Sequence, residues 1–146
     1  MATERELADR EAIRELAVRY ARAVDRRDWA LARTLFRDDA VLVGPRFELA
    51  GVEAILRGLA TVERYRATFH AVLNQLVDLA GDAASGETYC LANHFFERDG
   101  RAWRLDWGIR YQDRYRRAGD AWRFSRRELI VDWEQELEVV GPRRAG

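Results

Sequence analysis

Residues 88–117 read TYCLANHFFERDGRAWRLDWGIRYQDRYRR, and this stretch decides the fold. Side chains alternate in polarity on both sides of Asp99-Gly100, a dipeptide that favours the left-handed backbone of a two-residue turn. The stretch therefore predicts an antiparallel hairpin whose strands run from Thr88 to Arg98 and from Ala102 to Arg117.

Two more runs with a period of two extend the hairpin into a meander. One precedes it, from Phe69 to Leu79, and one follows it, from Ala121 to Val131 or beyond. The separators are rich in turn residues, from Gly81-Asp82 through Ser85-Gly86 and again at Ala118-Gly119-Asp120. We expect four long, consecutive strands after residue 68.

The first third of the chain has the three- and four-residue apolar spacing of helices. Asp9 and Asp28 can cap two of these helices, because a carboxylate accepts the free N–H groups of a first turn. The expected elements are helices at Asp9–Val24, Trp29–Phe36 and Gly51–Leu59, with a short strand at Ala40–Val43 that ends at Gly44-Pro45. Helices followed by hairpins predict the α+β class, with the helices on one face of the sheet.

Length and composition limit the possible functions. The 146 residues fit one domain, 1–146, with a core from about residue 9 to residue 133, and we expect the tail from Gly141 to be frayed. All 25 basic residues are arginine, which excludes Schiff-base aldolases, pyridoxal phosphate enzymes and phosphate-loop nucleotide hydrolases. The 25 acidic residues balance them, so no nucleic acid or membrane partner is expected. The only serines, Ser85 and Ser125, lack a nucleophile-elbow context.

Cysteine and histidine are scarce. Cys90 is the only cysteine, so the chain can form no internal disulfide and no two-cysteine metal site. A zinc site made by His70, His94 and Asp25 lacks the short spacing of metal motifs, and we expect no metal and no cofactor. The charged segment from Met1 to Arg10 does not resemble a secretion signal, which favours a cytoplasmic protein.

Short motifs follow one another in a recognisable order from about Asp9 to Trp133. They are Tyr20, Val24-Asp25-Arg26-Arg27-Asp28-Trp29, Thr68-Phe69-His70 with Asn74, His94, Tyr111-Gln112-Asp113-Arg114-Tyr115 and Gly119-Asp120-Ala121-Trp122-Arg123-Phe124. This order resembles the nuclear-transport-factor-2-like superfamily, and within it the SnoaL-like branch that includes scytalone dehydratase and hexachlorocyclohexane dehydrochlorinase. The resemblance implies a cone-shaped α+β barrel, with three N-terminal helices packed on a strongly curved, mostly antiparallel sheet around one pocket.

The resemblance also implies a proton-abstracting site. In scytalone dehydratase a pocket aspartate after the first helix pairs with a histidine on the strand after the third helix, and Asp25 and His70 match these places. His94 matches a second pocket histidine, and it shares a strand face with Cys90 and Ala92. The dehydrochlorinase supports the same Asp25–His70 dyad. We expect an Asp25 carboxylate oxygen within about 2.6–3.2 Å of a His70 ring nitrogen.

The groups that polarise the substrate differ from those of both enzymes. Val24 replaces the tyrosine that precedes the dehydratase aspartate, and Tyr111 falls where the dehydratase has an asparagine. The basic residue of the dehydrochlorinase pocket falls near Tyr20. The resemblance therefore implies that the base is retained while the substrate changes.

Elementary chemistry explains why a base would need both residues. An aspartate alone is a poor base near neutral pH, because its reference pKa is about 3.9. Beside a histidine it can fix the imidazole tautomer and stabilise the imidazolium that forms when the histidine takes a proton. The structural alternatives are that Asp25 only ends a helix and that His70 is an ordinary packed strand residue.

The function expected from these residues is that of a cofactor-independent lyase or isomerase. It would be a dehydratase, double-bond isomerase or cyclase acting on a small hydrophobic substrate of polyketide or aromatic type. The catalytic candidates are Asp25, His70 and His94, with His94 or a pocket tyrosine serving the departing oxygen. The substrate-binding candidates are Tyr20, Val24, Asn74, Tyr89, Cys90 and Tyr111.

The alternative function is non-catalytic. A ligand-binding or assembly module, or the small subunit of an aromatic-ring dioxygenase, would share the fold. Co-purification with a larger iron–sulfur subunit would favour the dioxygenase subunit, whereas a homo-oligomer with an enclosed Asp25–His70 contact would favour the enzyme. The resemblance, together with the Arg- and Trp-rich outer strand faces, implies a homo-oligomer, a trimer or a dimer. We expect Arg116-Arg117 and Arg126-Arg127 to lie at solvated sheet edges or in ion pairs between subunits.

Overall fold

The computed structural model describes residues 1–140, so the expectation for the tail from Gly141 lies outside the described residues. Three α-helices and one short 3-10 helix accompany six strands. The helices are α1 (Glu4–Arg26), α2 (Trp29–Leu35), α3 (Val52–Leu59) and the 3-10 helix Ala60–Arg64. The strands are β1 (Phe36–Gly44), β2 (Phe47–Ala50), β3 (Ala67–Ala80), β4 (Ala83–Arg98), β5 (Arg101–Ala118) and β6 (Ala121–Glu138).

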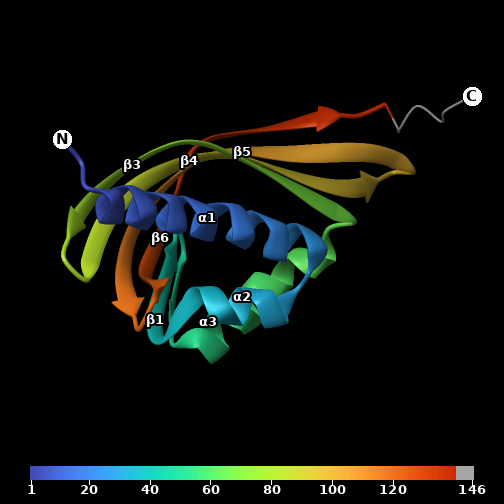
Figure 1. The fold of residues 1–146 in the computed structure, drawn as a ribbon. Coiled ribbons are helices and arrows are strands. Elements are labelled where there is room, and N and C mark those ends of the chain that lie inside the picture. The colour runs from blue at the N-terminus through green and yellow to red at the C-terminus, as the bar shows by residue number, and fades with distance from the viewer. Residues whose placement is uncertain (141–146) are drawn as a thin grey trace, which may run out of the picture.

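The strands form one curled sheet with the order β2-β1-β6-β5-β4-β3. All neighbouring pairs are antiparallel except β1 and β6, which run parallel. The long strands bend over α1, and α2 and α3 lie below it (Figure 1). The predicted α+β cone, with three helices on a curved and mostly antiparallel sheet, is confirmed; the sheet stays open between its edge strands β2 and β3.

The predicted central hairpin is confirmed in detail. Asp99 and Gly100 both have positive φ, 53° and 74°, as a two-residue turn between twisted strands requires. The strand before it is longer than predicted, because β4 begins at Ala83 rather than Thr88. Ser85 and Gly86 therefore belong to the strand, and the turn is reduced to Gly81 and Asp82.

The first helix begins five residues earlier than predicted. Its N-cap is Thr3, whose hydroxyl accepts the N–H of Glu6 while the Glu6 carboxylate accepts the N–H of Thr3. The prediction that Asp9 caps the helix is wrong. Asp9 accepts hydrogen bonds from Arg117 (2.7 Å) and Trp122 (3.0 Å), and so joins α1 to the end of the β5–β6 hairpin.

The elements around α2 also differ slightly from the prediction. Asp28 caps α2 through the N–H of Leu31, as predicted, but the helix ends at Leu35. Phe36 already belongs to β1, which is longer than the predicted strand Ala40–Val43. The strand β2 was not predicted, because four residues are too few to show a period.

An extra residue in β6 determines which arginine is buried. Tyr115 pairs with Phe124 but Arg114 pairs with Arg126, so Ser125 is inserted as a bulge. The bulge leaves Arg126 half-buried and turns Arg127, which is 1% exposed, into the core. The expectation that Arg126-Arg127 is solvated or lies between subunits is therefore wrong for Arg127.

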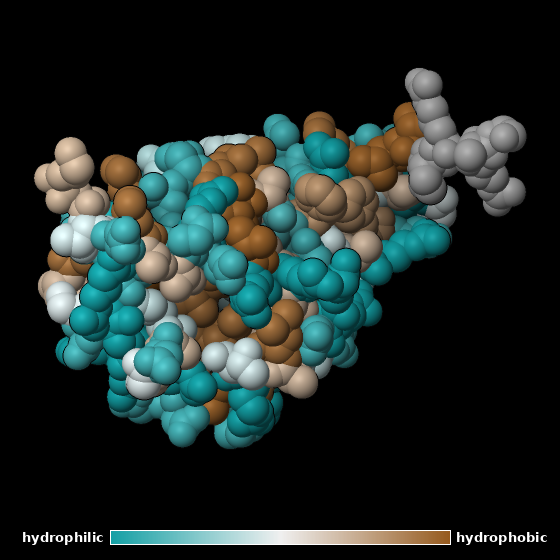
Figure 2. All heavy atoms as spheres, viewed as in Figure 1, coloured by the Kyte–Doolittle hydropathy of each residue, from teal (hydrophilic) through white to brown (hydrophobic). Residues whose placement is uncertain are grey.

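The core fills the space between the helices and the inner sheet face, and it includes α1 from Ile13 to Val24 and the inward side chains of β1, β4, β5 and β6. On the face shown in Figure 2, hydrophilic residues surround separate hydrophobic patches. Within residues 1–140 no helix is long and apolar enough to cross a membrane.

Candidate active site

A cavity of about 280 Å³ lies between the helices and the inner face of the sheet. Its apolar wall is formed by Val24, Leu42, Phe47, Leu49, Leu59, Val62, Ile109 and Leu129. Its polar and aromatic groups are Tyr20, Arg64, Tyr65, His70, His94, Trp107 and Tyr111. A mostly apolar wall with a few polar groups is typical of a site for a small organic molecule.

Asp25 and His70 meet at one side of this cavity. Asp25 lies in the last turn of α1, and its Oδ1 is 2.6 Å from Nδ1 of His70, within the range expected from the sequence. Oδ1 also accepts the hydroxyl of Thr68, and Oδ2 accepts the backbone N–H of His70, both at 2.9 Å. Four groups from two elements are therefore held in one arrangement.

The charge state of the pair follows from these contacts. Burial raises the pKa of Asp25, but the hydrogen bonds from His70 and Thr68 outweigh it, and the pKa lies below its usual value. The carboxylate is thus ionised at neutral pH and can only accept. The Nδ1 atom of His70 must carry the proton between them, and in the neutral ring the lone pair is therefore on Nε2.

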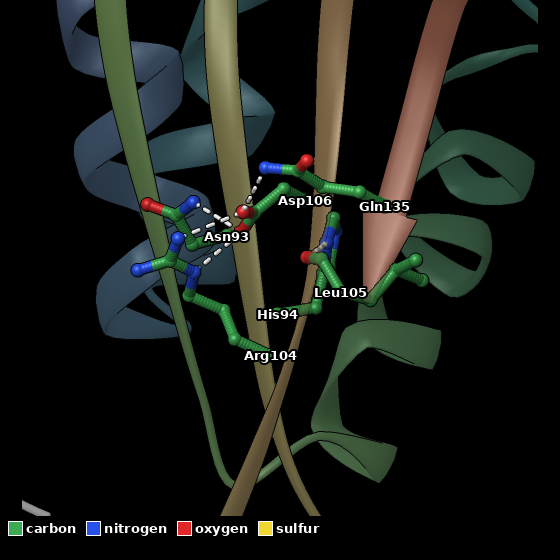
Figure 3. A network of polar contacts seen from close by, with 6 residues as sticks. All are labelled: Asn93, His94, Arg104, Leu105, Asp106 and Gln135. Atoms are coloured by element: carbon green, nitrogen blue, oxygen red, sulfur yellow. Dashed lines mark hydrogen bonds and ion pairs between the residues drawn. The ribbon is translucent and has the colours of Figure 1, made fainter. Parts of the chain in front are cut away.

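His94 lies on the neighbouring wall, on β4, and is 3% exposed. Its Nδ1 is 3.1 Å from the backbone carbonyl oxygen of Leu105 on β5 (Figure 3). The ring packs against both Tyr65 and Trp107, with centroid distances of 4.9 and 4.6 Å, and its centroid is 6.1 Å from that of His70. Burial lowers the pKa of His94, and the bond to the carbonyl offsets this only in part.

A polar network fixes the opposite side of the same strands. Asp106 accepts two hydrogen bonds from Arg104, at 2.6 and 2.8 Å, and one each from Asn93 (2.6 Å) and Gln135 (3.2 Å) (Figure 3). Burial raises the pKa of Asp106, and these donors bring it below its usual value. The network holds β4, β5 and β6 together next to Leu105, whose carbonyl oxygen is the hydrogen-bond partner of His94.

A buried cation lies behind the tyrosine wall. The guanidinium carbon of Arg127 is 3.6 Å from the ring centroid of Tyr111 and 4.2 Å from that of Tyr20, and its Nε is 3.0 Å from Oδ1 of Asp113. Burial raises the pKa of Tyr20 to about 12 and that of Tyr111 well above its usual value. Both phenols therefore keep their protons, and the Tyr111 hydroxyl has no hydrogen-bond partner among residues 1–140.

The structure separates the predicted site residues into two groups. Asp25, His70, His94, Tyr20, Val24 and Tyr111 come together at the cavity, although Asp25 stands behind His70 rather than on the wall. Cys90 is buried next to the wall without lining it. Two predictions are wrong. Tyr89 is 39% exposed, because the strand pleat turns it away from the face of Cys90. Asn74 is exposed at the register shift of β3 between Val72 and Gln75.

Sequence reasoning missed several residues of the site. Tyr65 and Trp107 flank His94, and Arg127 with Asp113 supports Tyr111. Only Trp107 carried a detectable signal, since it has the same strand parity as Tyr111. Thr68 was noted in the Thr68-Phe69-His70 motif, but its bond to the dyad was not predicted.

The described residues offer no obvious metal centre. Within residues 1–140 no group of three or more His, Cys, Asp or Glu side chains is placed to hold an ion. Hydrogen bonds to protein donors occupy both carboxylate oxygens of Asp25.

Comparisons with known proteins agree with this fold. A family model described as the SnoaL-like domain matches residues 5–128, and no curated protein sequence matches the chain. A protein from Novosphingobium aromaticivorans proposed to be a scytalone dehydratase is 23% identical, with a TM-score of 0.79 over 96% of each chain. A hexachlorocyclohexane dehydrochlorinase from Novosphingobium barchaimii is 20% identical, with a TM-score of 0.78 over 96% of each chain.

A third structure has a different description. A protein from Novosphingobium aromaticivorans proposed to be an aromatic ring hydroxylase is 26% identical, with a TM-score of 0.79. The match covers 91% of this chain and 94% of that one.

Proposed function

The chain belongs to the SnoaL-like domain family, and from this premise we propose that it is a cofactor-independent lyase or isomerase that acts on a small, largely apolar substrate. The observation that carries the proposal is the 2.6 Å contact between Asp25 and His70 at the side of an apolar cavity. A half-buried carboxylate paired with a cavity histidine can serve as a general base.

In the proposed reaction His70 removes a proton from carbon. Its Nε2 lone pair takes the hydrogen of a C–H bond that lies next to a carbonyl or a leaving group. The electron pair of that bond forms a C=C double bond, either as an enolate or with loss of the leaving group. Asp25 stabilises the imidazolium that results, and its three hydrogen bonds keep the ring in the orientation that presents Nε2.

The tyrosine wall would stabilise the oxygen on which charge develops. Tyr111 has a buried hydroxyl without a hydrogen-bond partner among the described residues, and Arg127 lies against its ring and reinforces a positive potential there. Because the pKa of Tyr111 is raised, the phenol remains a hydrogen-bond donor across the physiological range. We therefore assign the polarising role to Tyr111, assisted by Tyr20, rather than to His94.

Elimination of water, shift of a double bond and cyclisation all use this chemistry. The cavity volume of about 280 Å³ suits one or two fused rings, so we propose a polyketide-like or aromatic substrate. We further propose that the protein acts in the cytoplasm as a homo-oligomer, trimer or dimer. Light scattering at micromolar concentration tests the oligomer, and a monomer there would contradict it.

The test is proton exchange at carbon. The wild type is incubated in deuterated buffer with a panel of β-hydroxy ketones and enones, and deuterium incorporation or elimination is followed by NMR. His70→Ala should abolish turnover, and Asp25→Asn should lower it by about 10⁴-fold, as loss of the orienting charge does in comparable dyads. Asp78 is an exposed carboxylate on β3, the strand of His70. Asp78→Asn is therefore the matched control and should leave turnover unchanged.

Two results would contradict the proposal. Full activity of His70→Ala would exclude His70 as the base. Loss of wild-type activity on chelation would point to a metal-dependent reaction. The non-catalytic alternative, with a dioxygenase-type assembly, predicts co-purification with a larger iron–sulfur subunit and only modest effects of His70→Ala and Asp25→Asn.

A further inference from the structure

We propose that His94 is a hydrogen-bond acceptor that selects ligands carrying a free hydroxyl group on the side of the cavity next to the base. This inference deepens the proposed function, and it rests on that function only for the identity of the ligand as a substrate. It gives His94 a role in specificity and removes it from the proton-donating step.

The tautomer of His94 follows from its hydrogen-bond partner. Its Nδ1 lies 3.1 Å from the carbonyl oxygen of Leu105, and a carbonyl oxygen can only accept. The hydrogen of the neutral ring must therefore be on Nδ1, and the lone pair must be on Nε2. Burial keeps the ring neutral, because it lowers the pKa of His94. A neutral His94 in this tautomer has no proton to give to a departing oxygen.

The orientation of the His94 ring is restrained by its neighbours. Tyr65 and Trp107 both pack against it, at centroid distances of 4.9 and 4.6 Å. A 180° flip would replace Nδ1 by a C–H group and leave the Leu105 carbonyl without its donor. The packing and the hydrogen bond therefore fix Nε2 as the atom that is free to meet a ligand, and it has no partner among residues 1–140.

The two histidines face the same cavity. In its neutral form His70 also presents a bare Nε2, since its Nδ1 is held by Asp25. The two rings are nearly perpendicular, at 77°, with centroids 6.1 Å apart. One acceptor is the proposed base, and the other must be satisfied by a donor on the ligand. An alcohol, enol or phenol supplies this donor, whereas an ether or halide leaves a buried nitrogen unpaired.

The first experiment reads the tautomer without any ligand. Long-range proton–nitrogen NMR correlations of the ¹⁵N-histidine protein at pH 7 should show His94 protonated on Nδ1 and bare on Nε2. An Nε2–H tautomer or an imidazolium for His94 would overturn the inference. This readout involves no turnover, so it can fail while the proposed base chemistry stands, and it can succeed while that chemistry fails.

The second experiment uses a matched pair of probes, 2-naphthol and its methyl ether 2-methoxynaphthalene, with calorimetric or NMR titration. One neutral hydrogen bond contributes about 1 kcal/mol, so wild type should bind the naphthol about five- to tenfold more tightly. The naphthol should also shift the Nε2 resonance of His94, while the ether should not.

Two variants assign the preference to one ring. His94→Phe keeps an aromatic ring between its neighbours and should reduce the preference to nearly onefold. His70→Phe should retain the preference although it removes the proposed base. A preference that is absent in wild type, that persists in His94→Phe, or that disappears only in His70→Phe would overturn the inference.

Discussion

Replacing Arg127 by methionine should make the stability of the protein depend on pH above neutrality. The guanidinium is buried against the rings of Tyr20, Tyr111 and Phe124, and its partner Asp113 has a fully buried side chain. Burial raises the pKa of Asp113 to about 6, although Arg127 opposes this. Without the cation, the pKa of Asp113 should rise well above 6.

The sign follows from proton binding. In the unfolded chain Asp113 titrates near its ordinary value of 3.8, so above pH 7 it is ionised there. In folded Arg127→Met the carboxyl of Asp113 keeps its proton, whereas in the unfolded chain it is ionised. The free energy of unfolding therefore falls as the pH rises, by about 1.4 kcal/mol per pH unit. Together with the lost contacts to the rings, the destabilisation should be about 3 kcal/mol at pH 7 and larger at pH 8.

Urea denaturation at several values between pH 7 and pH 8.5 measures the effect. The contribution of Asp113 in wild type should be nearly constant over this range, because its folded pKa of about 6 lies below it. Between pH 7 and pH 8.5 the free energy of unfolding of Arg127→Met should fall by up to about 2 kcal/mol more than that of wild type. The control is Arg127→Met with Asp113→Asn, which removes the titrating group while Asn still accepts the hydroxyl of Tyr115.

The control should follow the wild-type pH dependence, even if its stability is lower at every pH. Parallel curves for wild type and Arg127→Met would refute the reasoning, since they would mean that the orphaned carboxyl reaches water. A stability that rises with pH in the single variant would refute the sign.

Three further predictions concern other parts of the fold. Asp9→Ala should lower the free energy of unfolding, measured in urea, by about 1–3 kcal/mol, because it leaves the donors of Arg117 and Trp122 unpaired. An unchanged urea midpoint would mean that these hydrogen bonds do not hold α1 to the β5–β6 hairpin. Gly86→Ala should lower the free energy of unfolding by about 1–3 kcal/mol, since the new methyl group would lie 2.8 Å from a backbone oxygen of β3. An unchanged stability would mean that β3 and β4 can move apart without cost. Acidification from pH 7.5 should lower the free energy of unfolding, because the pKa of His94 is lowered in the folded protein and the unfolded chain binds the proton first. His94→Phe should reduce the slope of the free energy of unfolding against pH. An identical slope would count against the burial of the ring.

The sequence predicts those features of the fold that depend on neighbouring residues, and it does not predict features that depend on the pairing of distant strands. The turn at Asp99-Gly100 and the capping aspartate of α2 are local, and both were predicted correctly. The bulge at Ser125 is not local, because it exists only in the pairing of β6 with β5. The sequence analysis therefore placed Arg127 with Arg126 in solvent or between subunits, and it did not predict the cation behind the tyrosine wall.

The candidate site divides in the same way. Composition and spacing did not distinguish Asp25 from other helix-end carboxylates, and its partnership with His70 came from the order of motifs along the chain. Asn74 and Tyr89 were misplaced, since parity must be counted from a known inward residue and β3 shifts register between Val72 and Gln75. The carbonyl that fixes the His94 tautomer belongs to the backbone, which no side-chain pattern reveals.

The hydrogen bond from the backbone N–H of His70 to Asp25 has a consequence for solubility. β3 is an edge strand, and an edge strand offers unpaired N–H groups to any second strand that approaches. Asp25 occupies one of these groups at 2.9 Å and brings a negative charge to the edge, where α1 also lies (Figure 1). Asp25→Asn should therefore also speed the formation of thioflavin-binding aggregates under mild heating, and an unchanged lag time would separate protection of the edge from the chemistry of the site.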